Sequence, residues 1–209
     1  MHGTTSATLL EAVASRRDPS AQARGIRIGS VFFIAALTAA LAQLSVSLPF
    51  TQVPFTFQPT VVLLGGLVLG ARLGCAGQLL YLAAGVAGLP VFAMSPTLPP
   101  GPLRLLGPTG GYLMAYPMAA FLTGYLAERG FDRRYVTSIL AMCAGLVVIY
   151  SCGMMWLGLF ARTGAESAAL GLRAALVAGV APFVLPDLVK LAAAAGIGPG
   201  LWRLVGRTR

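Results

Sequence analysis

Residues 28–48 read IGSVFFIAALTAALAQLSVSL, a run of 21 residues without a charged side chain. About 20 predominantly apolar residues, rising 1.5 Å each in a helix, cross the hydrocarbon core of a bilayer. This stretch therefore predicts a membrane-spanning helix. It follows a polar tail, residues 1–27, whose basic residues close to the helix are Arg16, Arg17, Arg24 and Arg27.

The composition of the whole chain also indicates a membrane protein. Of its 209 residues, 57% are hydrophobic and only 10% are charged, and the mean hydropathy is +0.81. Soluble domains average about 25% charged residues, so this chain has too few charges to cover a surface that faces water. We expect an all-α integral membrane protein.

The scarcity of polar side chains excludes several enzyme classes. The only histidine is His2, and the only lysine, Lys190, does not follow the glycine-rich turn of a phosphate-binding loop. The chain therefore has no Walker A motif and no histidine for a catalytic triad or a zinc hydrolase. The cysteines Cys75, Cys143 and Cys152 lie in apolar runs without metal-ligand spacing. We expect no enzymatic activity, no metal and no cofactor.

Further apolar runs predict a membrane domain of six helices over residues 28–209. Between the first two helices, residues 49–59 contain three prolines, which prevent a continuous helix. A second irregular segment, residues 90–108, is rich in proline and glycine. The predicted spans after the first are residues 60–70, 73–89, 110–127, 135–160 and 186–205.

The last span has two possible placements. In the preferred one it begins at Pro186, which suits the first position of a helix, and Asp187 lies in the first turn. Residues 165–181 then form a surface or re-entrant helix. In the alternative, the span covers residues 174–197, and Asp187 and Lys190 lie nearer the middle of the membrane.

The arginines predict the orientation. With six spans and cytoplasmic N- and C-termini, three arginines lie outside: Arg104, Arg162 and Arg173. Eleven lie inside: Arg16, Arg17, Arg24, Arg27, Arg72, Arg129, Arg133, Arg134, Arg203, Arg207 and Arg209. This distribution follows the positive-inside rule. The net charge of +9 is therefore a topology signal and does not require nucleic acid as a partner.

Asp187 and Lys190 are the best candidates for a binding site. Ionised groups inside a bilayer cost about 2.5–3.5 kcal/mol each on insertion scales and often mark a function. Their i, i+3 spacing puts both on one helix face, where they either neutralise each other or present an acceptor and a cationic donor to a ligand. Gln78 and Tyr81 share a face of the third span and are weaker candidates, because such a pair often only bridges helices.

Four blocks, in order, resemble the BioY family, the biotin-specific substrate-binding (S) subunits of energy-coupling-factor (ECF) transporters. The blocks are Leu48-Pro49-Phe50-Thr51 with Val53-Pro54-Phe55-Thr56-Phe57-Gln58, then Gly88-Leu89-Pro90-Val91-Phe92-Ala93, then Gly107-Pro108-Thr109-Gly110-Gly111-Tyr112, and finally Pro182-Phe183 with Pro186-Asp187-Leu188-Val189-Lys190. Two departures are Gln52, where the family usually has proline, and Met94-Ser95-Pro96, where glycines are common.

The resemblance implies high-affinity biotin binding and uptake across the bacterial cytoplasmic membrane, with biotin as the transported ligand. A membrane coupling subunit and a pair of ATPases on other chains supply the energy. The expected substrate-binding residues are Gln58, Phe92, Thr109, Gly110, Gly111, Tyr112, Asp187 and Lys190. Asp187 and Gln58 suit the ureido ring, whereas Lys190 either meets the carboxylate of biotin or holds Asp187 ionised. Phe92 and Tyr112 suit the apolar middle.

The first span carries the expected contact with the coupling subunit. Ala35 with Ala39, and Ala36 with Ala40, are pairs of small residues four apart, which allow another helix to approach closely. The family uses such an alanine motif for docking, although ordinary packing within the chain explains the same pattern. Other readings of the sequence are a proton-coupled secondary transporter that uses Asp187, an S subunit for a different vitamin, and a membrane protein without transport activity.

Overall fold

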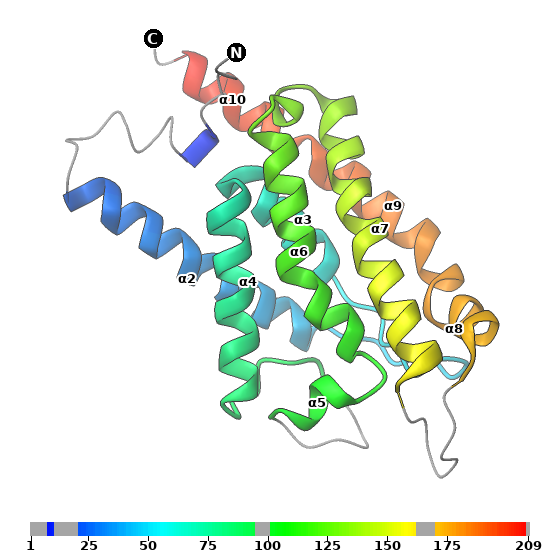
Figure 1. Cartoon of the computed structure of the whole chain (residues 1–209). Coiled ribbons are helices and arrows are strands. Elements are labelled where there is room, and N and C mark those ends of the chain that lie inside the picture. Colours follow the sequence, from blue (N-terminus) through cyan, green and yellow to red (C-terminus); the bar gives the residue numbers. More distant parts are fainter. Residues whose placement is uncertain (1–7, 11–20, 95–100, 162–169, 208–209) are drawn as a thin grey trace, which may run out of the picture.

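The computed structural model describes residues 8–10, 21–94, 101–161 and 170–207. Within these residues the regular elements are helical (Figure 1). Their bounds are α2 Ala21–Gln43, α3 Gln58–Leu69, α4 Ala71–Val86, α5 Leu103–Leu106, α6 Gly110–Ala127, the 3-10 helix η1 Phe131–Arg133, α7 Tyr135–Leu159, α8 Leu172–Gly179, α9 Ala181–Ala195 and α10 Ile197–Arg207.

In the described part of the chain, three helical stretches are long and apolar enough to cross a membrane: Gln22–Gln43 in α2, Tyr135–Leu159 in α7, and Ala181–Leu204, which combines α9 and α10. The prediction of an all-helical membrane protein is confirmed. The shorter helix α3 is apolar as well. That all six predicted segments span the bilayer stays a prediction.

The bounds of two predicted spans, the first and the last, were wrong. The first helix begins at Ala21 rather than at Ile28. It ends at Gln43 rather than at Leu48, because the backbone of Val46 pairs with that of Phe55. The last span begins at Ala181, so Pro186 lies inside α9 and Asp187 is in its second turn rather than its first. The predicted surface helix before it corresponds to α8, and residues 162–169 lie outside the described part.

The predicted tail of residues 1–27 is only partly described. Residues 21–27 form the start of α2, while Thr8, Leu9 and Leu10 are buried. Arg16 and Arg17 lie outside the described residues, as do Arg162 and Arg209 from the topology argument.

Helix α6 is the central element of the bundle, and it contacts α3, α4 and α7 (Figure 1). The close approach depends on glycine. A Cβ atom on Gly66 of α3 would collide with the carbonyl oxygen of Ala120 in α6, and one on Gly124 of α6 would collide with the backbone at Ala71. Small residues of this kind let helices pack closely where the hydrophobic effect cannot drive association.

A tight corner connects α3 to α4. Gly70 is the single residue between them and has φ +85°, a conformation that other residues adopt only with strain. The carboxylate of Glu128 accepts the N–H of Ala71 at 2.9 Å, so the end of α6 caps the start of α4. This corner lies at the same end of the bundle as the connection between α6 and α7.

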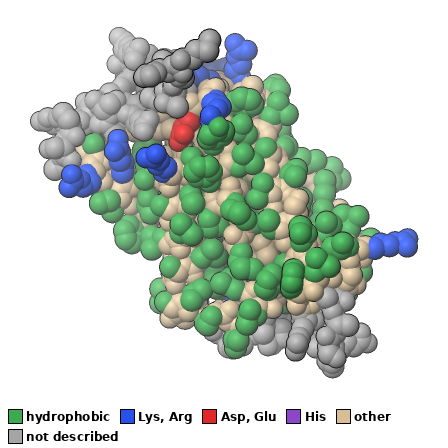
Figure 2. Space-filling view, in the orientation of Figure 1, with side chains coloured by type: hydrophobic (Ala, Val, Ile, Leu, Met, Phe, Trp, Pro, Cys, Tyr) green, Lys and Arg blue, Asp and Glu red, His purple; other side chains and the backbone are tan. Residues whose placement is uncertain are grey.

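The two ends of the molecule differ in charge. Figure 2 shows a largely hydrophobic flank, with most of its Lys and Arg side chains gathered toward the end that carries α10. The exposed arginines of the helix ends there and of η1 are Arg72, Arg129, Arg133, Arg134 and Arg203. α5 lies at the opposite end (Figure 1). The flank and the charged end fit a chain embedded in a bilayer.

Candidate functional site

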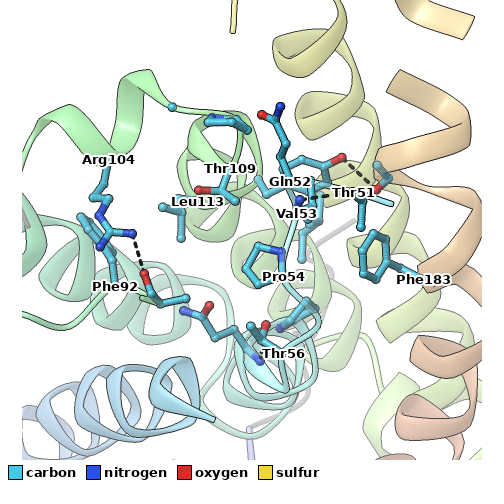
Figure 3. A pocket seen from close by; sticks show the side chains of 18 of the residues that line it. Thr51, Gln52, Val53, Pro54, Thr56, Phe92, Arg104, Thr109, Leu113 and Phe183 are labelled. Carbon is cyan, nitrogen blue, oxygen red and sulfur yellow. Dashed lines mark hydrogen bonds between the residues drawn. The ribbon is translucent and has the colours of Figure 1, made fainter. Parts of the chain in front are cut away.

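A cavity of about 690 Å³ lies at the end of the bundle that carries α5. Its walls come from the segment before α3, the residues after α4, the region of α5, and the helices α6, α7 and α9 (Figure 3). The proline-rich segment contributes its own stretch of wall, with Thr51, Gln52, Val53, Pro54 and Thr56. An irregular backbone at membrane depth is tolerated where it lines such a cavity.

Asp187 supplies the carboxylate of the cavity wall and is held by two side chains. Its Oδ1 accepts a hydrogen bond from Lys190 Nζ at 2.8 Å, and its Oδ2 accepts one from the Tyr150 hydroxyl at 2.7 Å. Asp187 is only 4% exposed. Since a carboxylate has about four lone-pair sites, two partners leave acceptor capacity for a ligand.

Lys190 is not among the residues that line the cavity, and it binds the proline-rich segment through a hydrogen bond and contacts with aromatic rings. Its Nζ donates to the carbonyl oxygen of Thr56 at 2.7 Å. The same ammonium group lies 3.5 Å from the ring centroid of Phe55 and 4.9 Å from that of Phe57. Cation–π contacts of this kind are attractive, more so when desolvated. One lysine therefore fixes both Asp187 and the segment that opposes it.

Gln58 lines the cavity at the first position of α3 and is 2% exposed. Its Nε2 donates to the hydroxyl oxygen of Tyr81 at 2.6 Å. The ring of Tyr81 makes an edge contact with Phe92, with centroids 5.4 Å apart, and stacks on Tyr116 at 6.4 Å. Gln58 is thus oriented by its hydrogen bond to Tyr81, while its amide oxygen remains available as an acceptor.

Gln78 and Tyr81 of α4 make different contacts. Tyr81 supports Gln58, as described above. Gln78 donates from Nε2 to the Thr38 hydroxyl oxygen at 3.2 Å and so bridges α4 to α2.

In the glycine-rich block of residues 107–112, some residues line the cavity and others only pack against neighbouring helices. Thr109 and Tyr112 line the cavity, and the Tyr112 hydroxyl donates to the carbonyl oxygen of Gly179 at 2.8 Å. Gly110 and Gly111 are not among the lining residues. The N–H of Gly110 donates to Gly107 at 3.0 Å, and a Cβ on Gly111 would collide with Trp156. Gly111 thus lets the start of α6 approach α7, whereas a Cβ on Gly110 would collide with the carbonyl group of Leu105 in α5.

Arg104 is a cavity residue that the sequence argument placed only as an outer arginine. It comes from the single turn of α5, and its Nη1 donates to the carbonyl oxygen of Ala93 at 2.7 Å. Burial lowers the pKa of the Arg104 guanidinium, but arginine stays charged in proteins. Figure 3 shows Arg104 and Phe183 on opposite sides of the cavity. Asp187 lies one turn after Phe183 on α9.

The sequence argument also missed Tyr150 and the apolar residues that complete the wall. A tyrosine within the apolar run of α7 was the available signal for Tyr150, but only the fold turns it toward Asp187. The remaining apolar lining includes Leu48, Val53, Leu113, Ile149 and Phe183. A mainly apolar lining with a few fixed polar groups is typical of small-molecule sites.

The four alanines expected to contact the coupling subunit lie on two different faces of α2. Ala35 is buried and Ala39 is half-buried, so both pack toward the bundle. Ala36 and Ala40 are exposed, and so are the neighbouring Phe32 and Phe33. In the described part of the chain, no group of three His, Cys, Asp or Glu side chains is placed to hold a metal ion.

Known proteins resemble the chain along most of its length. The family model described as the BioY family matches residues 16–207. A probable biotin transporter BioY of Pyrococcus horikoshii is 42% identical over 181 residues, which cover 87% of this chain and 97% of that protein. The biotin transporter BioY of Thermotoga maritima is 36% identical, covering 76% and 86%.

A solved structure has the same fold. The crystal structure of the S-component for biotin from an ECF-type ABC transporter superposes with a TM-score of 0.74 at 22% identity, covering 89% of this chain and 95% of the other. On the extent of the family match and the identity to its relatives, this chain is a member of the BioY family.

Proposed function

We propose that this chain captures biotin and serves as the substrate-binding subunit of an ECF-type transporter. The observation that carries the proposal is a largely apolar cavity with one carboxylate, Asp187, and one guanidinium, Arg104, among its described lining residues. Relatives with 36–42% identity are named as biotin transporters or probable ones. Biotin has a neutral ureido ring with two N–H donors, an apolar middle and a carboxylate tail, which matches this distribution.

The charges favour one orientation of the ligand. Asp187 accepts hydrogen bonds and repels another carboxylate, so the ureido N–H groups belong at the α9 side of the cavity. Gln58 offers a further acceptor there. The carboxylate tail then points toward Arg104, because arginine and a carboxylate form strong, charge-assisted hydrogen bonds. Phe92, Tyr112 and Phe183 are left to enclose the apolar middle. In this arrangement Lys190 acts through Asp187.

For the membrane, we propose six spans with both termini on the cytoplasmic side. The spans are α2, α3, α4, α6, α7 and the combined α9–α10. The arginines at the α10 end then lie in the cytoplasm, in agreement with the positive-inside rule. The cavity opens toward the outer side of the cytoplasmic membrane, where an importer collects its substrate.

Other chains supply the energy in this proposal. The chain lacks a Walker A motif, so ATP hydrolysis falls to a pair of ATPases that act through a transmembrane coupling subunit. The exposed Ala36 and Ala40 on α2 provide the surface for that subunit, because small side chains four residues apart allow close helix contact.

The test is a titration of the purified chain in detergent, without partners, with radiolabelled biotin and with biotinamide, which has no charged tail. We expect saturable binding near one biotin per chain and weaker binding of biotinamide. In Arg104→Gln, biotin affinity should fall about tenfold or more, and the preference for biotin over biotinamide should disappear. Arg173→Gln is the matched control, since Arg173 is exposed on α8 and does not line the cavity.

Two results would contradict the proposal. A folded wild-type chain that binds no biotin would refute the ligand, and an Arg104→Gln variant that still prefers biotin would refute the orientation. In cells, biotin uptake should require co-expression of the coupling subunit and the ATPases.

A further inference from the structure

The segment Pro90, Val91, Phe92 and Ala93, here called the outer strap, forms one side of the cavity after α4 ends. Phe92 and Ala93 both line the cavity. The Phe92 ring is 6% exposed and rests against Tyr81 and Gly85, where a Cβ atom would collide with it. A ligand enclosed by Phe92 leaves on this side only if the strap lifts.

Side chains hold the strap more than backbone pairing does. Its backbone is held by one backbone–backbone hydrogen bond among the described residues, from the Val91 N–H to the carbonyl oxygen of Leu89 at 2.8 Å. Three of its carbonyl oxygens accept side-chain donors instead. Gln43 Nε2 lies 3.2 Å from the Pro90 oxygen and 3.5 Å from the Phe92 oxygen. Arg104 donates to the carbonyl oxygen of Ala93 at 2.7 Å, a bond drawn as a dashed line in Figure 3.

Gln43 is well placed to anchor the strap because its own backbone is fixed. It is the last residue of α2, and three residues later Val46 pairs with Phe55 through two N–H···O bonds of 2.9 Å. The Phe55 ring in turn lies under Lys190. The amide has two hydrogens for its three nearby acceptors, which include the carbonyl of Ala39 at 3.3 Å. One exposed side chain therefore ties the end of a long helix to the strap.

We infer that Gln43 is a positioning residue that keeps the outer strap closed and thereby sets how long the bound ligand stays. This rests on the proposed function, because the ligand is taken to be biotin. Segments held by few hydrogen bonds open locally at low cost. Losing the Gln43 donor should raise the opening frequency, and affinity changes of this kind fall mostly on the dissociation rate.

The experiment compares variants that differ in their donor. Gln43→Met keeps the length of the side chain without a donor, whereas Gln43→Lys keeps a donor. Gln22→Met, at the other end of α2 and also exposed, is the matched control. Radiolabelled biotin is bound to each purified chain and chased with unlabelled biotin. We expect about three- to tenfold faster dissociation from Gln43→Met, a rate close to wild type from Gln43→Lys and Gln22→Met, and unchanged melting temperatures.

A second measurement does not need the ligand. Hydrogen exchange of the backbone amides from Leu89 to Ala93, in the chain without biotin, should be faster in Gln43→Met than in wild type, and unchanged in Gln22→Met. If wild type bound no biotin, the proposed function would fail while this exchange test of the strap remained valid. An unchanged dissociation rate together with unchanged exchange would overturn the inference. Equally fast dissociation from Gln43→Lys and Gln43→Met would also overturn it, because the donor would then not be what holds the strap.

Discussion

Replacement of Lys190 by methionine removes the ammonium group that contacts both Asp187 and the proline-rich segment. The methionine keeps an unbranched side chain of similar length, so packing against Phe55 is largely preserved. Four interactions of the ammonium group disappear: the ion pair with Asp187, the hydrogen bond to Thr56, and the contacts with the Phe55 and Phe57 rings. Asp187 then stays buried, and the Tyr150 hydroxyl is the side chain that still donates to it.

The magnitude follows from the burial of this pair. Lys190 is 9% and Asp187 4% exposed, and truncating one partner of a buried, hydrogen-bonded charge pair costs about 2–5 kcal/mol. Since about 1.4 kcal/mol corresponds to a factor of ten in affinity, biotin binding should weaken by more than tenfold. The companion variant Asp187→Asn should also lose more than tenfold, because the acceptor for the ureido group is lost.

The assay is the biotin titration combined with thermal unfolding in detergent. Lys190→Met should lower the melting temperature as well as the affinity. The double variant Lys190→Met/Asp187→Asn contains no uncompensated charge, so it should recover stability but not binding. Near-normal affinity in both single variants would refute the assignment of this pair to the site. Recovery of binding in the double variant would show that the carboxylate is not the ligand's acceptor.

Three further predictions concern separate parts of the chain. Tyr150→Phe removes one hydrogen bond to Asp187 and should weaken biotin binding about tenfold, measured by the same titration; unchanged affinity would contradict this. Ala36→Leu should spare biotin binding but impair uptake with partners present, whereas lost binding would point to a folding role for α2. Burial raises the pKa of Asp132 above its ordinary value, although the Trp202 hydrogen bond opposes the shift. A raised pKa favours folding at low pH, and this stability is lost as the pH rises through the folded pKa. Asp132→Asn should therefore gain more melting temperature at pH 7 than at pH 4.

The sequence predicts those helices best whose apolar runs have charged or irregular boundaries. Residues 110–127 and 135–160 match α6 and α7 almost completely, because the charged residues from Glu128 to Arg134 separate two apolar runs without a charge. The end of the first helix was wrong because the pairing of Val46 with Phe55 is a contact between segments. Pro186 was wrongly taken as a helix start, although a proline inside a membrane helix is tolerated when neighbouring groups compensate.

In the candidate site, too, some residues could be predicted from the sequence and others could not. Asp187 stands out in the sequence because an ionisable group in an apolar span is rare. Tyr150 and Arg104 do not, because their importance depends on which side of α7 and of the α5 turn faces the cavity. Gly110 and Gly111 were expected to bind the ligand, but they are not among the lining residues and lie instead where α6 packs closely against α5 and α7. Distinguishing packing from binding at a glycine requires knowing its neighbours.

The two tryptophans of the chain lie at opposite ends of the bundle. Trp156 donates its indole N–H to Gly107, a residue of the cavity wall, at 2.9 Å, whereas Trp202 donates to Asp132 beside α10 at 2.6 Å. Ligand entry that disturbs the wall at Gly107 therefore changes the surroundings of one fluorophore and leaves the other as an internal reference. We therefore expect the steady-state emission of Trp156 to change on ligand binding, which would allow binding to be followed in native lipid without an attached dye.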